Sequence, residues 1–249
     1  MCVKRVPTVG GSIVLTDDGL AVDTRMAGFT ISPHEECAVE EAVRLTSESG
    51  GSVTVVTVGP VAAEEQLRAC LAVGASAATL VETLPGAPEL GPIATAACLS
   101  SVAASGSFDL VLLGNEAADT GDYQVGIRLA HLLGWPVATG VKSLSVPGGL
   151  VTASRNSARE TETFTLPLPC VVTVREGLNL PRYPSLPGRL RAKRAVIART
   201  PAAAAPDEFV RVRGLRVPSA AGRAATVLGQ GAEAVPALVS VLSDLGIVP

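Results

Sequence analysis

The chain has 249 residues, of which 47% are hydrophobic and 3% aromatic, and its formal net charge at pH 7 is -3. This length and hydrophobicity predict an ample core, in one large domain or in one domain with an extension. The mild negative charge excludes a general affinity for nucleic acid, and the scarcity of aromatic rings argues against a stacking site for bases or flavin rings.

Cysteine spacing and apolar run lengths give the expected compartment. The five cysteines form no Cys-x-x-Cys pair, and each lies in a segment of apolar or small residues. We therefore expect reduced core cysteines in a cytoplasmic protein. The sequence shows no leader of charged and then apolar residues and no apolar run of membrane-spanning length, so we expect neither export nor membrane insertion.

Short β-branched runs alternate with amphipathic stretches in the first half of the chain. A first short strand is expected to end near Arg5, and further strands are predicted over residues 52–58, 78–81 and 108–113. Helices are predicted over residues 35–49, 62–73, 93–104 and 124–133. Strands that alternate with helices of about 10 to 15 residues are typical of βαβ units around a parallel sheet.

The pattern changes after Pro136. Strands are predicted over residues 141–146, 150–154 and 161–165, with a turn at 147–149, and an apolar strand follows within 166–174. Residues 200–206 have the composition of a linker, and an apolar helix over 232–245 must pack on this domain or on another subunit. The predicted fold class is α/β: a wound, mostly parallel sheet with flanking helices, an added antiparallel hairpin region and a C-terminal extension ending in a helix.

A proline-fenced loop over residues 181–187 follows the apolar strand. Proline fixes φ and lacks an N–H donor, so such a loop cannot extend a sheet. The loop carries Leu186 and precedes a cluster of cations within 189–194, with no catalytic acid, base or nucleophile motif beside it. We interpret it as a docking surface for a partner with an acidic surface.

The segment over residues 114–126 is the best candidate for a nucleotide site, because it follows a buried strand and begins a helix. Asp119 would accept a hydrogen bond from a ribose hydroxyl or hold a cation; alternatively, Asp119 or Asp122 only caps the helix. The helix start at 32–35, with Ser32 as N-cap, Pro33 in the first turn and Glu35 as capping-box residue, is a second anion-friendly terminus or simply a good cap.

Other chemistry has little support in the sequence. No Gly-x-x-x-x-Gly-Lys-Ser/Thr loop and no Gly-x-Gly-x-x-Gly after a strand is present. His34 and His131, the two histidines, have no partner at metal-ligand spacing, which excludes a zinc site and a Ser-His-Asp triad. Glu40 and Glu41 are adjacent on the first helix and point in different directions, so we expect both to be solvated.

The chain resembles the β subunit of electron transfer flavoproteins over nearly its whole length. The matching pieces are residues 3–7, 32–33, 38–45, 71–75, 112–114, 124–126 and 168–193. Pro181-Arg182-Tyr183 followed by Leu186-Pro187 is the most specific of them. The family's first strand begins several residues earlier, so half of a central strand is expected to be missing here.

The resemblance implies an electron carrier subunit without bond-making chemistry of its own. It would pair with an α subunit that holds the redox-active FAD, accept electrons from flavin dehydrogenases of the acyl-CoA dehydrogenase class and pass them towards the respiratory chain. Residues 1–195 would form the nucleotide-binding domain, which holds AMP or a second FAD, and residues 196–249 a linker and C-terminal arm packing on the α subunit.

The resemblance also implies two sets of residues. The cofactor-binding set is Cys2, Ser32, Pro33, His34, Glu35, Val58, Gly114, Asn115, Glu116, Ala117, Ala118, Asp119, Thr120, Gly121, Asp122, Tyr123, Gln124 and Val125. The partner-docking set is Arg182, Tyr183, Leu186, Pro187, Arg189 and Arg191. Two other functions remain open: a stand-alone adenine-nucleotide sensor of the universal-stress-protein type, and an ATP-cleaving ligase domain.

Overall fold

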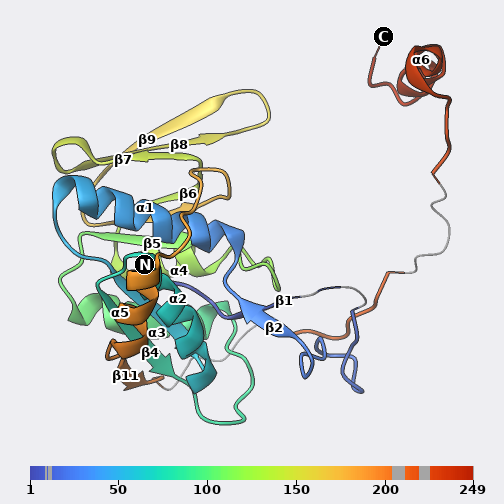
Figure 1. Cartoon of the computed structure of the whole chain (residues 1–249). Helices are drawn as coiled ribbons and strands as arrows, with labels where there is room; N and C mark the ends of the chain where they lie inside the picture. Colours follow the sequence, from blue (N-terminus) through green and yellow to red (C-terminus); the bar gives the residue numbers. More distant parts are fainter. Residues whose placement is uncertain (9, 11–12, 204–210, 219–224, 249) are drawn as a thin grey trace.

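The computed structural model describes residues 1–8, 10, 13–203, 211–218 and 225–248 (Figure 1). The strands are β1 (Val6–Thr8), β2 (Gly28–Thr30), β3 (Thr54–Gly59), β4 (Ala77–Glu82), β5 (Leu110–Gly114), β6 (Val137–Val141), β7 (Ser143–Ser145), β8 (Leu150–Asn156), β9 (Thr161–Pro167), β10 (Cys170–Val174) and β11 (Ala198–Pro201). The α-helices are α1 (Pro33–Ser49), α2 (Glu64–Val73), α3 (Pro92–Ser105), α4 (Val125–Leu133), α5 (Leu186–Arg194) and α6 (Val235–Asp244).

A parallel sheet forms the centre of the molecule. Its strands lie in two sets, β11-β4-β3 and β5-β10-β6, and every neighbouring pair in them is parallel. Residues 1–3 join the two sets, because the Cys2 N–H donates to the Leu112 carbonyl and the Val3 N–H to the Val56 carbonyl, each at 2.9 Å. The strand that was expected to end near Arg5 is therefore reduced to residues 1–3, which precede β1. Within the described chain, this short stretch pairs with β3 and β5 through isolated bridges at Cys2.

Helices cover both faces of this sheet (Figure 1). α1 and α2 pack on one face with Val55 and Val172, and α3 and α4 pack on the other with Val56 and Val171. Neighbouring residues of one strand thus enter opposite cores, as a parallel strand buried on both faces requires. The antiparallel unit β7-β8-β9 extends the fold beyond β6. The predicted fold class is confirmed.

Most predicted elements of the first half are confirmed, with ends within two residues of the prediction. The second half differs more. The strand predicted over 141–146 is divided between the end of β6, which is parallel to β10, and β7, which is antiparallel to β8. The predicted turn at 147–149 is a single 3-10 turn. The short pair β1 and β2 was not predicted, since three residues are too few to show a period.

The segment that was predicted as a loop up to Pro187 and a basic tail contains helix α5 from Leu186 onwards. Ser185 is its N-cap, and the Ser185 hydroxyl accepts a hydrogen bond from the Gly188 N–H at 3.1 Å. Pro187 lies in the first turn, where an N–H has no intrahelical partner in any helix. α5 packs on α2, and the Arg68 guanidinium donates to the Ala192 carbonyl at 2.8 Å. Leu186 therefore projects from a helix rather than from a flexible loop.

The C-terminal part begins inside the sheet. β11 pairs in parallel with β4, so Thr200 and Pro201 of the predicted linker are strand residues, whereas residues 204–206 lie outside the described ones. Helix α6 lies within the predicted apolar helix and stands apart from the sheet in Figure 1, and none of its residues is buried. Packing of this helix on another subunit stays a prediction.

The structure also shows the state of the cysteines and the length of the helices. All five cysteines are free; four of them are buried and Cys2 is half-buried. In the part of the chain that the structure describes, no helix has both the length and the hydropathy needed to cross a bilayer.

Candidate functional site

Three segments meet at the carboxyl edge of the sheet, where ligands of open α/β folds bind. They are residues 2–4 near the N-terminus, the start of α1, and residues 114–124 between β5 and α4. Gly114 lies directly against α1: a Cβ at this position would be 2.7 Å from Glu35 Cγ and 3.2 Å from the Glu35 backbone nitrogen. Glycine is therefore required for this close approach of strand end to helix start.

Hydrogen bonds join the three segments. The Ala118 N–H donates to the Ser32 hydroxyl at 2.9 Å, across 86 residues of sequence. The Glu35 carboxylate accepts from the Ser32 N–H at 2.9 Å and from the Lys4 N–H at 2.8 Å. The structure thus brings Ser32, Glu35 and Ala118 together, whereas their binding to a cofactor stays a prediction. These bonds occupy much of the start of α1, which supports the interpretation of this motif as a helix cap.

The start of α4 decides between the two interpretations of Asp119 and Asp122 that the sequence left open, because it contradicts the helix-cap alternative. Neither Asp119 nor Asp122 caps this helix; its N-cap residue is Gln124, which forms no side-chain cap bond. Instead the Gln124 side-chain oxygen accepts from the Arg128 guanidinium at 2.7 and 3.0 Å. Among the described residues, the first N–H groups of α4 therefore have no intrahelical or side-chain partner, so this terminus is the better anion-binding one of the two.

Lys4 is a site residue that the sequence analysis missed. Its ammonium group contacts Asp119 Oδ2 at 2.7 Å and Glu89 Oε1 at 2.5 Å. Burial alone would lower the pKa of Lys4, but the hydrogen bonds to Asp119 and Glu89 raise it, so the lysine stays charged. Asp119 is consequently held in place by an ion pair. The only sequence signal for Lys4 is its position at the end of the expected first strand, next to Arg5.

Glu35 is the buried acid of the site. Its burial raises its pKa to about 8, against the effect of the hydrogen bonds from Ser32 and Lys4 and of the Lys4 charge, which lower it. Its carboxylate faces backbone N–H groups, which identifies Glu35 as a structural acid that fixes the site.

Residues 115–123 form the outer wall of the site. Glu116 Oε1 lies 3.6 Å from His34 Nε2, and the buried His34 Nδ1 has no hydrogen-bond partner among the described residues. Tyr123 has a φ of 59°, in a region that side-chain-bearing residues rarely adopt, and its hydrogen bond to Glu116 raises its pKa. Such strain often marks a binding segment. A free imidazole nitrogen and the open start of α4 fit a polar, anionic ligand.

Asn115 ties this wall to the neighbouring strands. Its N–H donates to the Val174 carbonyl at 2.8 Å, and its side-chain oxygen accepts from the Thr173 hydroxyl at 2.7 Å. The same hydroxyl accepts from the Gly140 N–H at 3.1 Å. Thr173 and Gly140 were not predicted as supports, because these contacts cross between separate βαβ units. The remaining predicted site residues at this edge are Pro33, Ala117, Thr120, Gly121 and Val125, the first residue of α4.

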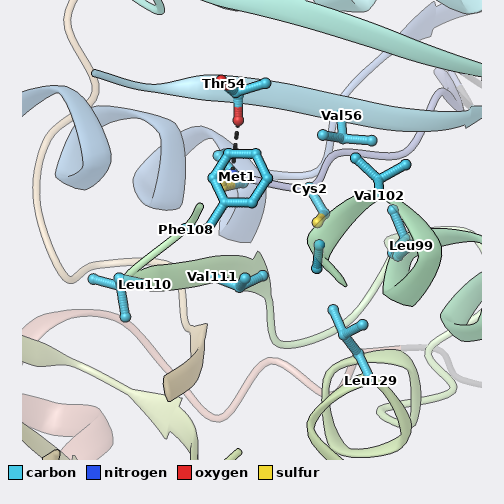
Figure 2. A pocket seen from close by; sticks show the side chains of 11 residues that line it. Met1, Cys2, Thr54, Val56, Leu99, Val102, Phe108, Leu110, Val111 and Leu129 are labelled. Atoms are coloured by element: carbon cyan, nitrogen blue, oxygen red, sulfur yellow. Dashed lines mark hydrogen bonds between the residues drawn. The ribbon is translucent and has the colours of Figure 1, made fainter. Parts of the chain in front are cut away.

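Cys2 and Val58 occupy the sheet just before this edge. Cys2 lies opposite Val56 of β3 and Leu113 of β5, and Val58 is the next-to-last residue of β3. Cys2 also lines the small pocket shown in Figure 2, together with Thr54 and Phe108 near the amino ends of the same strands. This apolar pocket therefore lies towards the amino end of the sheet and not among the polar groups of the candidate site.

The predicted docking residues lie on α5 and on the segment before it. Tyr183 is 94% exposed and Leu186 is 71% exposed. Arg182 pairs with Glu40, and the Arg191 guanidinium donates to the Leu71 carbonyl at 3.3 Å. The other two predicted residues on this surface are Pro187 and Arg189.

The expectation that Glu40 and Glu41 are solvated was wrong. Glu40 is 8% exposed and Glu41 only 2%. Each carboxylate is paired with a guanidinium, Glu40 with Arg182 and Glu41 with Arg44, and this pairing makes burial of the charge tolerable. Among the described residues no group of three or more His, Cys, Asp and Glu side chains is arranged to hold a metal ion.

Fold and site together define an α/β protein with a polar site at the carboxyl edge of a wound parallel sheet. The family model of the electron transfer flavoprotein domain matches residues 19–205. Curated relatives named electron transfer flavoprotein subunit beta match as well. That of Bacillus subtilis is 39% identical over 72% of this chain and 67% of the relative, and that of Bradyrhizobium diazoefficiens is 38% identical over 90% of both.

A human subunit of the same name is 37% identical over 79% of this chain and 78% of the relative. The chain therefore belongs to the electron transfer flavoprotein family, and the relatives it matches in that family are beta subunits. Its role is electron transport by a flavoprotein. The resemblance noted from the sequence is confirmed.

Proposed function

We propose that this chain is the beta half of a heterodimer that carries electrons on FAD shared with an alpha subunit. It accepts electrons from flavin dehydrogenases of the acyl-CoA dehydrogenase class and delivers them towards the respiratory chain, in the cytoplasm, while making and breaking no covalent bond of its own. The observation that carries this proposal is the 38% identity to a beta subunit over 90% of both chains.

The carboxyl-edge site would hold the adenosine monophosphate moiety of AMP or of a second FAD. The open N-terminus of α4 suits a phosphate group, and the unpartnered His34 Nδ1 offers a polar contact. Lys4 keeps Asp119 in place beside them. The shared FAD, when bound, supplies one- and two-electron chemistry, and this chain contributes binding and orientation. The arm over residues 196–249 would pack on the alpha subunit through the apolar side chains of α6.

Coexpression with the alpha subunit of the same organism tests the proposal. A yellow complex with one copy of each chain is the expected result. Acid extraction then separates the two ligand hypotheses, since one flavin with one AMP per complex indicates a simple carrier and two flavins indicate a second FAD in the beta subunit. A colourless monomer that binds ATP would instead support the universal-stress-type sensor.

Leu186 is the proposed anchor for the dehydrogenase, because it is an exposed apolar side chain on the helix that also carries the cations Arg191, Lys193 and Arg194. Leu186→Ala should raise the KM for the reduced dehydrogenase by about tenfold, the usual effect of truncating an interface anchor. Flavin content should stay unchanged. Leu132→Ala, an exposed leucine on α4, serves as the control and should leave the KM as in the wild type. Loss of flavin in Leu186→Ala would show that the anchor is misassigned.

A further inference from the structure

The segment between β10 and α5 is attached to α1 by an ion pair. The Arg182 guanidinium contacts Glu40 Oε1 at 2.7 Å through Nη2 and Glu40 Oε2 at 2.8 Å through Nε. The Arg182 backbone N–H donates to the same carboxylate at 3.1 Å. A two-pronged guanidinium–carboxylate pair of this kind fixes direction as well as distance.

Asn179 provides a second attachment to the same helix. Its side-chain nitrogen donates to the Cys37 carbonyl at 3.0 Å and to Glu41 Oε2 at 3.1 Å. The Cys37 thiol in turn donates to the Asn179 carbonyl at 3.6 Å. Two residues of the segment, three positions apart, are therefore held by one face of α1.

The attached segment leads into the exposed residues of the docking surface. Tyr183 follows Arg182 directly, and Ser185 starts the helix that carries Leu186. The charge of Arg182 is already matched within the chain. Burial alone would raise the pKa of Glu40, but its hydrogen bonds with Arg182 lower it, and the same contact raises the pKa of Arg182. Because the Glu40 carboxylate already neutralises the Arg182 guanidinium, Arg182 would attract an acidic partner only weakly.

We propose that Glu40 is a positioning residue of the docking surface and that Arg182 acts as an internal tether rather than as a partner contact. This inference rests on the proposed function of the surface. Without the tether, residues 178–185 would have to be ordered when the dehydrogenase binds, and the lost conformational freedom would weaken the complex. Prolines at 181 and 184 limit this freedom without fixing the segment to α1.

Hydrogen exchange and kinetics of the heterodimer test the tether. Glu40→Gln should speed amide exchange over residues 178–186 by roughly three- to tenfold, a modest factor because Arg182 is half-exposed. It should raise the KM for the reduced dehydrogenase by a similar factor and leave kcat and flavin content unchanged. Arg182→Gln should do the same, and the double variant should be no worse than either single one.

Glu48→Gln is the matched control. Glu48 lies two turns further along α1, and its side chain is 62% exposed, so exchange and KM should match the wild type. An increase in KM for Arg182→Gln alone, with wild-type exchange and KM in Glu40→Gln, would mean that Arg182 contacts the partner directly and would overturn the inference. If wild-type heterodimer accepts no electrons, the proposed function fails, and the exchange experiment still decides whether the tether exists.

Discussion

Gly114→Ala is expected to destabilise the protein by about 1–3 kcal/mol, the usual cost of forcing a carbon atom into a packed site. The new Cβ would be 2.7 Å from Glu35 Cγ and 3.2 Å from the Glu35 backbone nitrogen, so α1 itself must move. Because that movement pulls Ser32 away from Ala118, we also expect a large loss of bound adenine nucleotide. Thermal unfolding and nucleotide content of the purified heterodimer measure the two effects.

Gly59→Ala is the matched control for this change. Gly59 ends β3 as Gly114 ends β5, but a Cβ there would meet Ala63 Cβ at 3.7 Å, an ordinary contact. This variant should remain within about 0.5 kcal/mol of the wild type, as substitutions without a clash usually do. Equal stability and equal nucleotide content in the two variants would refute the close approach of β5 to α1.

Local sequence signals were sufficient for the elements that build the sheet. Repeated β-branched residues predicted β3, and the Ser32-Pro33 start with the glycine after Ser49 predicted α1, because each signal lies within the element itself. α5 was missed for the opposite reason. Pro187, together with Pro181 and Pro184 before the helix, resembles the prolines of a loop, and the compatibility of Pro187 with a first helical turn depends on the cap at Ser185.

The candidate site was predictable as far as strand ends and helix starts determine it. Residues 114–126 were predicted as a site because they follow a buried strand and begin a helix, and residues 32–35 because they begin another helix; only the resemblance implied that both contribute to one site. The partners of the charged residues were not predictable. Lys4 and Asp119 are 115 residues apart, and Glu40 and Arg182 are 142 residues apart, so no local pattern links them. The burial of Glu40 and Glu41 follows from such distant partners.

Glu41→Ala is the other substitution with a large expected effect. The Glu41 carboxylate is 2% exposed and accepts from Arg44 at 2.5 and 3.1 Å and from Asn179 at 3.1 Å. Its removal takes one acceptor from the Arg44 guanidinium and one from the Asn179 amide, which among the described residues keep only their bonds to Glu48, the Leu144 carbonyl and the Cys37 carbonyl. Breaking a buried pair costs about 3–5 kcal/mol, and the exposure of Arg44 reduces the expected loss here to about 2–4 kcal/mol.

Glu48→Ala is the matched control, because Glu48 pairs with the same Arg44 guanidinium at 2.8 Å. That second carboxylate is 62% exposed, and an exposed pair of this kind contributes about 0.3–0.5 kcal/mol. Urea unfolding of Glu41→Ala and Glu48→Ala therefore compares two carboxylates on one guanidinium. A loss in Glu41→Ala several times that in Glu48→Ala means that burial determines the contribution of each pair. Equal losses would mean that Glu41 is hydrated in solution and that α1 does not hold Asn179 through it.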